Sequence, residues 1–260
     1  MKIFAFCMEC QRELGHPSFE PIFADYYEGG KATITCSRGH ESVLMVQSQK
    51  FEVLLESGVA AYLDSHTIEA SLSFSIALER FFEFCIRVFC KSEKVDAQEF
   101  DKSFKQMSHQ SERQIGAFLS LFLLKIGRSY KINEDIVQFR NKIVHKGYIP
   151  SSDEVDIFAS KVYKEIYDII LLLRERYSNE MQNVIMDDLS LRAKDIPAGI
   201  PVATSTGTIF FCLAQAQLKA TFHEALSNYK EARKMIDDSI PYMEQLHMIV
   251  RATNKTETEA

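Results

Sequence analysis

The longest stretch of helix-spaced apolar residues lies between Thr67 and Cys90. Leu, Ile, Phe and Val recur there at intervals of three and four residues, and near the centre they occupy both faces. This pattern predicts a helix that is buried on more than one side. A second stretch of the same kind runs from Asp153 to Tyr177, and Pro150 and Ser151 before it are a start signal for a helix. We therefore expect two long helices that enclose the middle of the chain.

Shorter apolar patterns predict further helical segments around these two. Residues 47–65 are expected to form a helical linker, and residues 112–126 a helix that Gly127 terminates. Residues 97–110 are polar and are expected to form a loop or a short helix. Asn133 is a candidate N-cap for one more short helix.

The two ends of the chain differ from this helical centre. Ala32–Thr35 has the composition of a β-strand. Residues 196–218 carry no charge but are broken by proline and glycine, which predicts a loop followed by a strand or a buried helix start at Thr208–Leu213. Two helical patterns follow, at residues 221–236 and 240–250. Residues 254–260 form a polar tail that is expected to be disordered.

The apolar patterns predict a mainly α protein, and length and composition are those of an ordinary globular chain. Its 260 residues are 46% hydrophobic and 25% charged, which is ordinary for a soluble chain with one large or two smaller cores. The patterns divide it into a small β element (residues 1–50), a helical domain (residues 51–180) and an α-rich C-terminal extension (residues 181–260). The net charge of −6 gives no general attraction for nucleic acid, so any contact with RNA must rest on a local basic patch.

The cysteines and the N-terminus bear on the compartment. The chain has six cysteines without the setting of a secreted disulfide framework, and its first apolar run is too short for a signal peptide. No stretch is apolar enough for a membrane helix. We expect a cytoplasmic protein with reduced thiols and no membrane contact.

Four potential metal ligands occur as two close pairs in the first 50 residues. Cys7 and Cys10 form a C-x-x-C pair, and Cys36 and His40 flank a turn that contains Gly39. Two such pairs joined by a hairpin can complete a tetrahedron around zinc, and the arrangement resembles a Cys3His zinc ribbon. Because protein side chains would fill all four positions, the zinc would be structural and not catalytic.

Three alternatives to this zinc site are open. The C-x-x-C pair could be redox-active, although such a pair normally begins a helix in a βαβ context, and no helix is predicted after Cys10. The four residues could also be a chance cluster. Finally, His16 could be the fourth ligand in place of His40.

The densest group of chemically useful side chains lies between Phe139 and Gly147. Asn141 and His145 are four residues apart and share a helical face, with Arg140 beside that face. Arginine offers a planar set of donors to phosphate oxygens, and histidine exchanges a proton near neutral pH. Cleavage of an RNA phosphate ester needs both. The same residues also suit an ordinary helix C-terminus, where basic side chains answer the macrodipole and Gly147 forms the cap.

The pattern R-N-x-x-x-H formed by Arg140, Asn141 and His145 resembles the signature of HEPN domains, including the Lys and Gly that follow. The resemblance covers roughly residues 55–180. The family usually places its signature at the junction of two helices, with a long helix before and after. The resemblance implies an all-helical, HEPN-like bundle. Many members of the family are metal-independent ribonucleases in toxin, antiviral-defence and RNA-processing systems.

For this chain the resemblance implies an RNA endonuclease whose ribose 2′-OH attacks the adjacent phosphate, leaving a 2′,3′-cyclic phosphate and a 5′-hydroxyl end. It implies His145 as general acid or base, Arg140 as the cation on the phosphate and Asn141 as an orienting residue. Arg140 and His145 are polar and lie near a helix end, so we expect their side chains to carry little core packing. HEPN-like chains often have an acidic residue on the preceding helix, which points to Glu79 or Glu83, although a solvated or ion-paired face also accounts for both.

The family usually builds its site between two subunits, so the resemblance implies a homodimer. The other expected partners are RNA and a regulatory protein. Two further functions are open: a non-catalytic module whose helices and zinc ribbon bind a partner protein or RNA, and a zinc-dependent enzyme. The last is disfavoured because the only ligand cluster is saturated by protein side chains.

Overall fold

The computed structural model describes residues 2–25, 28–107 and 109–258, with side chains for residues 3–25, 28–107 and 109–251. The prediction of a mainly helical chain with small sheets at its N-terminus is confirmed, since 63% of it is helical. The chain forms two compact units, each built from segments distant in sequence. The sheet unit comprises Met1–Ser48, Asp188–Ile209 and Ser227–Ala260, and the helical unit comprises Gln49–Asp187 and Phe210–Leu226.

The sheet unit contains two small sheets. In the first, β1 (Lys2–Ala5) pairs antiparallel with β2 (Ile22–Asp25). In the second, β3 (Lys31–Thr35), where a strand was predicted, pairs antiparallel with β4 (Glu41–Val46), and β5 (Val202–Ser205) lies parallel to β4. The inward-facing side chains of β1 to β4 form one apolar cluster: Ile3, Ala5, Ala24, Ile34, Leu44 and Val46.

The prediction of a strand or a buried helix start at Thr208–Leu213 is wrong, because these residues form neither. The only described strand in this region is β5, which ends at Ser205, before the most apolar residues begin. Val43 is opposite Val202 and Val46 is opposite Ser205, so β5 is defined by its pairing with a strand from the other end of the chain. A local hydrophobic pattern contains no information on such a partner.

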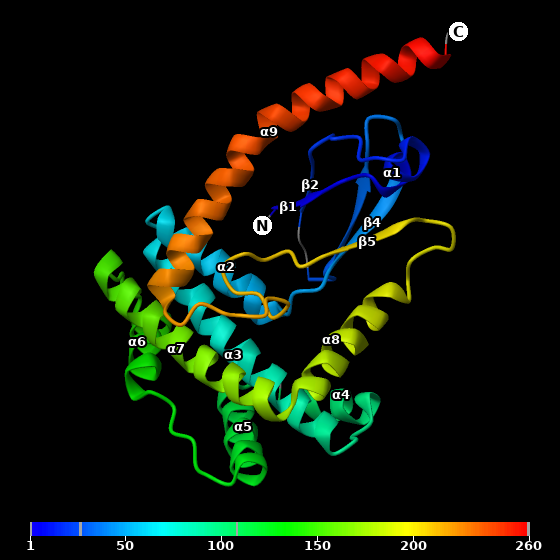
Figure 1. The fold of residues 1–260 in the computed structure, drawn as a ribbon. Coiled ribbons are helices and arrows are strands. Elements are labelled where there is room, and N and C mark those ends of the chain that lie inside the picture. Colours follow the sequence, from blue (N-terminus) through cyan, green and yellow to red (C-terminus); the bar gives the residue numbers. More distant parts are fainter. Residues whose placement is uncertain (1, 26–27, 108, 259–260) are drawn as a thin grey trace. The chain divides into compact units, whose positions relative to one another are not determined.

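In the helical unit, α3 (Thr67–Ser92) is the central element (Figure 1). Its contacts with four other helices explain why apolar residues occupy both of its faces: α2 (Lys50–Leu63), α5 (Ser111–Ile126), α6 (Glu134–Lys146) and α7 (Ser152–Arg176). Residues 97–110 include a short helix, α4 (Ala97–Lys105). Aromatic rings fill much of the core; Phe82 of α3 and Phe118 of α5, for example, stack at 4.4 Å.

Capping residues fix both ends of α6, the helix that carries Arg140 and His145. The side chain of Asn133 accepts a hydrogen bond from the amide of Asp135, as predicted for an N-cap. Gly147 ends the helix with φ of 63°, a left-handed conformation that glycine adopts without strain. Gly127 closes α5 in the same way, and Ser151 opens α7 with a capping box.

Two buried carboxylates hold the segment before α9 against α2. Glu52 accepts a hydrogen bond from the amide of Leu213, and Glu56 accepts one from the amide of Phe210. Arg174 of α7 donates to three carbonyl groups of the same segment. Burial raises the pKa of Glu52 to about 7, although hydrogen bonds from two backbone amides and the charge of Arg174 favour its ionised form. This segment is therefore a fixed part of the helical unit.

The C-terminal part of the chain differs from expectation in three ways. A further helix, α8 (Ser178–Ala193), follows α7 directly. One long helix, α9 (Phe222–Thr258), replaces the two that were predicted, because the interior Pro241 removes only one backbone hydrogen bond and does not end the helix. Residues 254–258 continue this helix instead of forming a disordered tail, and residues 259 and 260 lie outside the described residues.

None of the helices in the described ranges combines the length and the apolar character needed to cross a membrane.

Candidate functional site

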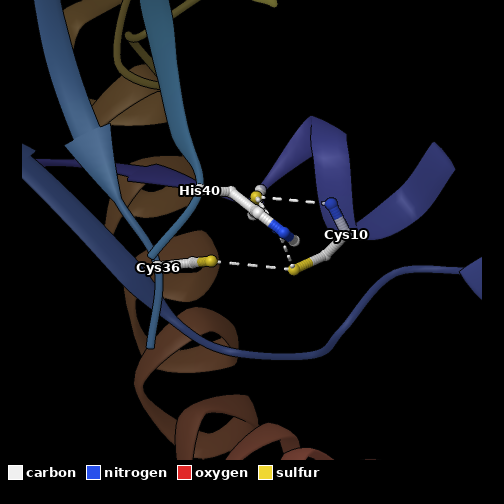
Figure 2. Close-up of side chains that lie close together, drawn as sticks. Cys10, Cys36 and His40 are labelled. Carbon is white, nitrogen blue, oxygen red and sulfur yellow. Dashed lines mark hydrogen bonds between the residues drawn. The ribbon is translucent and has the colours of Figure 1, made fainter. Parts of the chain in front are cut away.

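The four predicted metal ligands come together in the sheet unit. Cys7 and Cys10 lie at the start of α1 (Met8–Leu14), and Cys36 and His40 lie at the turn between β3 and β4. Figure 2 shows Cys36 and His40 pointing toward Cys10 from this turn. One ligand atom from each of the four residues lies within 4.8 Å of the others, and the three cysteines are buried.

The distances within this cluster fit a tetrahedral metal site. With zinc–sulfur bonds of about 2.3 Å and zinc–nitrogen bonds of about 2.0 Å, tetrahedral ligand atoms lie roughly 3.5–3.8 Å apart. The Sγ atoms of Cys10 and Cys36 are 3.7 Å apart, and Sγ of Cys10 lies 3.3 Å from Nδ1 of His40. Sγ of Cys7 lies 4.0 Å from the same nitrogen. A disulfide needs sulfurs about 2.05 Å apart, and all three cysteines are free.

Local backbone structure explains how each pair presents its ligands. Cys7 is the N-cap of α1, and its Sγ accepts a hydrogen bond from the amide of Cys10 at 3.4 Å. In the second pair, the amide of Gly39 donates to the carbonyl of Cys36 at 2.9 Å, with φ of 83° at the glycine. A Cβ at Gly39 would meet no atom within 4 Å, so glycine is not needed to save space. It is favoured because it adopts this left-handed conformation without strain.

Glu13 and Arg38 surround the cluster and were not predicted. Oε1 of Glu13 lies 3.5 Å from Nε2 of His40, which leaves Nδ1 of the same ring for a metal. Metal-binding histidines usually donate their second ring N–H to such a carboxylate, which sets the tautomer and orients the ring. Arg38 lies 2.8 Å from the second carboxylate oxygen and donates toward Sγ of Cys10 at 3.9 Å. The place of Glu13 one helical turn after Cys10 was the available sequence signal.

The acid–base state of Cys10 also fits a metal site. Burial, followed by hydrogen bonds with Cys36 and Cys7, raises the pKa of Cys10 to about 12. Three buried thiols this close cannot ionise together unless a cation compensates their charge. A bound metal would supply that charge, and the thiols would release protons on binding.

The geometry of the cluster bears on two of the alternatives to the zinc site, the His16 ligand and the redox-active cysteine pair. His16 lies outside the cluster, is exposed, and has its Nδ1 2.9 Å from the carbonyl oxygen of Pro17. The expectation that no helix follows the C-x-x-C pair is wrong, because Cys7 caps α1. The pair nevertheless contacts Cys36 and His40, so it belongs to a cluster of four ligands.

The second candidate site is the last two turns of α6. Asn141 is half-buried there, while His145 is exposed and forms no hydrogen bond or ion pair with any residue that the structure describes. Val137 and Val144, on the same side of the helix, are 43% and 44% exposed. This side of α6 therefore presents a free histidine beside two half-exposed apolar side chains.

Arg140 lies on another side of α6 and contacts α3. Its guanidinium donates to Oδ1 of Asn141 at 3.2 Å and to Oε1 of Glu79 at 3.4 Å. The side chain is 26% exposed, so Arg140 is half-buried against α3 through polar contacts. The ion pair with Glu79 is longer than the roughly 2.8 Å of a tight charged hydrogen bond, and it uses only part of the guanidinium.

The two acidic residues of α3 have different surroundings. The pKa of Glu79 is raised, chiefly by burial, although Arg140 and Arg80 favour its ionised form. Glu83 pairs with Arg80 at 2.6 Å and with Arg87 at 3.4 Å. Of the two, only Glu79 therefore contacts the Arg140 segment, and Glu83 belongs to an ion-paired face of α3.

A small cavity of about 130 Å³ lies beside α6. Phe139 of α6 and Phe158 of α7 line it, with ring centroids 4.7 Å apart, and Lys161 and Asp135 form an ion pair of 2.6 Å at its edge. Arg140 and His145 are not among its lining residues. His145 is therefore exposed outside this cavity, and Arg140 is half-buried against α3.

Comparison with protein-family models, with curated proteins and with solved structures finds no match to this chain.

Proposed function

We propose that this protein is an RNA endonuclease of the HEPN type. The observation that carries the proposal is the arrangement at the end of α6. There an unpartnered, exposed histidine lies five residues after an arginine whose guanidinium retains free N–H donors. The position of α6 between the long helices α3 and α7 agrees with the family pattern, and Glu79 lies where that pattern often has an acidic residue.

In the proposed reaction, His145 accepts the proton of a ribose 2′-OH, and that oxygen attacks the adjacent phosphorus. The bond from phosphorus to the 5′-oxygen breaks, and a second histidine protonates the leaving oxygen. Arg140 stabilises the crowded, negatively charged phosphate through its free donors, and Asn141 orients the guanidinium. The products are a 2′,3′-cyclic phosphate and a 5′-hydroxyl end.

This chemistry needs two histidines, and each chain supplies one at this position. A two-fold dimer with α6 at the interface would place two copies of His145 on opposite sides of one phosphate. Val137 and Val144 provide apolar surface for such a contact next to Asn141, and half-exposed apolar residues flanking a polar site are a common feature of interfaces.

Val137→Asp tests the dimer. A charge buried at an interface without a partner is unfavourable, so the variant should become monomeric and lose most RNA cleavage at micromolar concentration. Light scattering and a cleavage assay on the same samples measure both. Met186→Asp is the control, because Met186 on α8 is 58% exposed and should tolerate the charge. This variant should keep the oligomeric mass of the wild type in light scattering. A monomeric wild-type protein that cleaves RNA would contradict the dimer.

Glu79 is proposed as a positioning residue for Arg140. Glu79→Gln keeps the size of the side chain but removes the charge that holds the guanidinium, so kcat should fall about 10-fold with little change in KM. Glu83→Gln is the matched control, one turn along α3 and paired only with other arginines. An equal loss of kcat in both variants would show a general effect on α3. Full activity of Glu79→Gln would exclude the positioning role.

We further propose that the metal at Cys7, Cys10, Cys36 and His40 is zinc, with a structural role. Three thiolates and one imidazole are the ligands of a closed structural zinc site, and protein atoms fill every position, so no place is left for substrate. The sheet unit would then serve as an accessory element for binding RNA or a regulatory protein.

One experiment tests the central proposal. Purified protein is incubated with total RNA in excess EDTA, and the ends of the fragments are mapped. Fragments with 2′,3′-cyclic phosphate and 5′-hydroxyl ends are expected, because no metal takes part in the proposed step. Intact RNA, or ends with 5′-phosphates, would contradict it.

A non-catalytic binding module is the second candidate function. It is favoured by the contact between Arg140 and Glu79, which partly neutralises the arginine, and by the absence of both signature residues from the cavity beside α6. On this alternative the same assay gives intact RNA, while RNA or a protein partner still binds.

A further inference from the structure

A larger cavity, of about 270 Å³, lies in the helical unit between α7 and the loop that joins α5 to α6. Four consecutive loop residues line it: Arg128, Ser129, Tyr130 and Lys131. Phe122 of α5 and two aliphatic side chains of α7 form an apolar wall, and Asp168 of α7 adds a carboxylate. An apolar wall with a few polar groups gathered at one side is the usual construction of a small-molecule site.

The loop side of this cavity is positively charged. Arg128 is exposed and forms no hydrogen bond or ion pair with another residue in the described parts of the chain. Lys131 pairs with Glu134 at 2.9 Å, but its side chain is 84% exposed and can turn toward a ligand. On the opposite side, Asp168 pairs with Lys164 at 2.8 Å. An anionic group is therefore favoured next to the loop, and a hydrogen-bond donor next to Asp168.

The loop also carries hydrogen-bonding groups that the described residues leave unused. The hydroxyl of Tyr130 is buried without a hydrogen-bond partner, while its ring packs on Phe122 with centroids 5.0 Å apart. The backbone amides of residues 128–132 donate to no other described residue. Consecutive free amides beside cationic side chains favour binding of an anion rich in acceptor oxygens, such as a phosphate.

We propose that this cavity binds one nucleotide unit. Arg128, Lys131 and the loop amides hold the phosphate, the apolar wall beside Phe122 holds the base, and Asp168 accepts a hydrogen bond from a ribose hydroxyl or a base amino group. The volume is just below the range of about 300–1,000 Å³ for ligand pockets, which suits a single nucleotide. A free mononucleotide and a nucleotide within an RNA strand share this chemistry. Binding at this site does not require that the proposed cleavage reaction takes place.

A ligand in this cavity would lie next to the start of α6, the helix that carries Arg140 and His145. The loop ends at Asn133, the N-cap of α6, whose side chain accepts a hydrogen bond from the amide of Asp135. A nucleotide held by Arg128 and Lys131 therefore orders the segment directly before the helix that carries Arg140.

The test is isothermal titration of the full chain with adenosine 5′-monophosphate, adenosine, inorganic phosphate and a short 2′-O-methyl oligoadenylate, which lacks the attacking hydroxyl. The monophosphate should bind saturably, and more tightly than adenosine or phosphate alone. Arg128→Gln and Lys131→Gln should each weaken its binding ~10-fold, because each removes a charge-assisted hydrogen bond. Lys102→Gln, an exposed lysine of α4 that pairs only with Glu99, is the control and should bind as the wild type does.

Hydrogen exchange locates the ligand, because the amides of residues 128–132 should become protected when it binds. Binding of the oligoadenylate alone, lost in Arg128→Gln, would support the site with an RNA strand as the source of the nucleotide. The proposal is overturned by absence of saturable binding of either ligand, by binding that both variants leave unchanged, or by protection confined to other residues. Equal affinity for phosphate and the monophosphate would exclude a role for the apolar wall.

Discussion

His145→Ala is expected to reduce RNA cleavage by ~10²–10⁴-fold, the usual effect of removing a general acid or base. Its side chain is exposed and has no partner among the described residues, so the free energy of unfolding should change by no more than roughly 0.5 kcal/mol. Cleavage rates and thermal unfolding measured on the same preparation test both statements. If His145 is merely a favourable charge at the end of α6, the result reverses, with some loss of stability and none of activity.

Arg140→Ala should reduce cleavage by a similar factor of ~10²–10³, because it removes the cation that stabilises the phosphate in the transition state. It differs from His145→Ala in its effect on stability. Arg140 is 26% exposed and faces Glu79, which is 24% exposed, so its removal leaves a half-buried carboxylate without its partner. We expect a loss of about 1 kcal/mol, measured by denaturant unfolding.

His109→Ala is the control for both variants, because His109 is an exposed histidine outside α6. It should retain full activity and stability. Cleavage by the wild-type chain should also persist in EDTA. Undiminished cleavage by the double variant of Arg140 and His145 would remove these residues from the mechanism and with them the proposed enzyme class.

Cys36→Ser is expected to release the metal and to unfold the sheet unit. Metal analysis of wild-type protein purified under reducing conditions should find about one zinc per chain. Apparent binding energies at structural zinc sites are about 10–16 kcal/mol near neutral pH, as large as the whole stability of a typical domain. Loss of one thiolate from a cluster with its ligand atoms within 4.8 Å should therefore remove most of the stability of this unit.

Hydrogen exchange and limited proteolysis should locate the damage in the sheet unit, leaving the helical unit protected. Cys90→Ser is the matched control, because Cys90 is a half-buried thiol on α3 outside the cluster, and this variant should keep its zinc. A wild-type chain purified without any bound metal, or a Cys36→Ser chain that retains it, would contradict the site.

Features that depend on neighbouring residues were predictable from the sequence. The period of apolar residues from Thr67 predicts α3 because side chains three and four apart share a helical face. Asn133, Gly127 and Ser151 mark helix ends because their conformations and hydrogen bonds involve only the next few residues. The two pairs of potential metal ligands were recognisable for the same reason, since each is placed by one turn or one helix end.

Only the tertiary structure decided which distant surfaces meet. Pairing of Val43 with Val202 makes β5 a strand, and the contact with Glu79 makes Arg140 a half-buried side chain. The place of Glu13 beside His40 and the cavity that Arg128 shares with α7 also join residues far apart in the sequence. A periodic pattern reports which face of an element is apolar, but not what covers it. That depends on the burial and charge pairing gained by the whole chain when it folds.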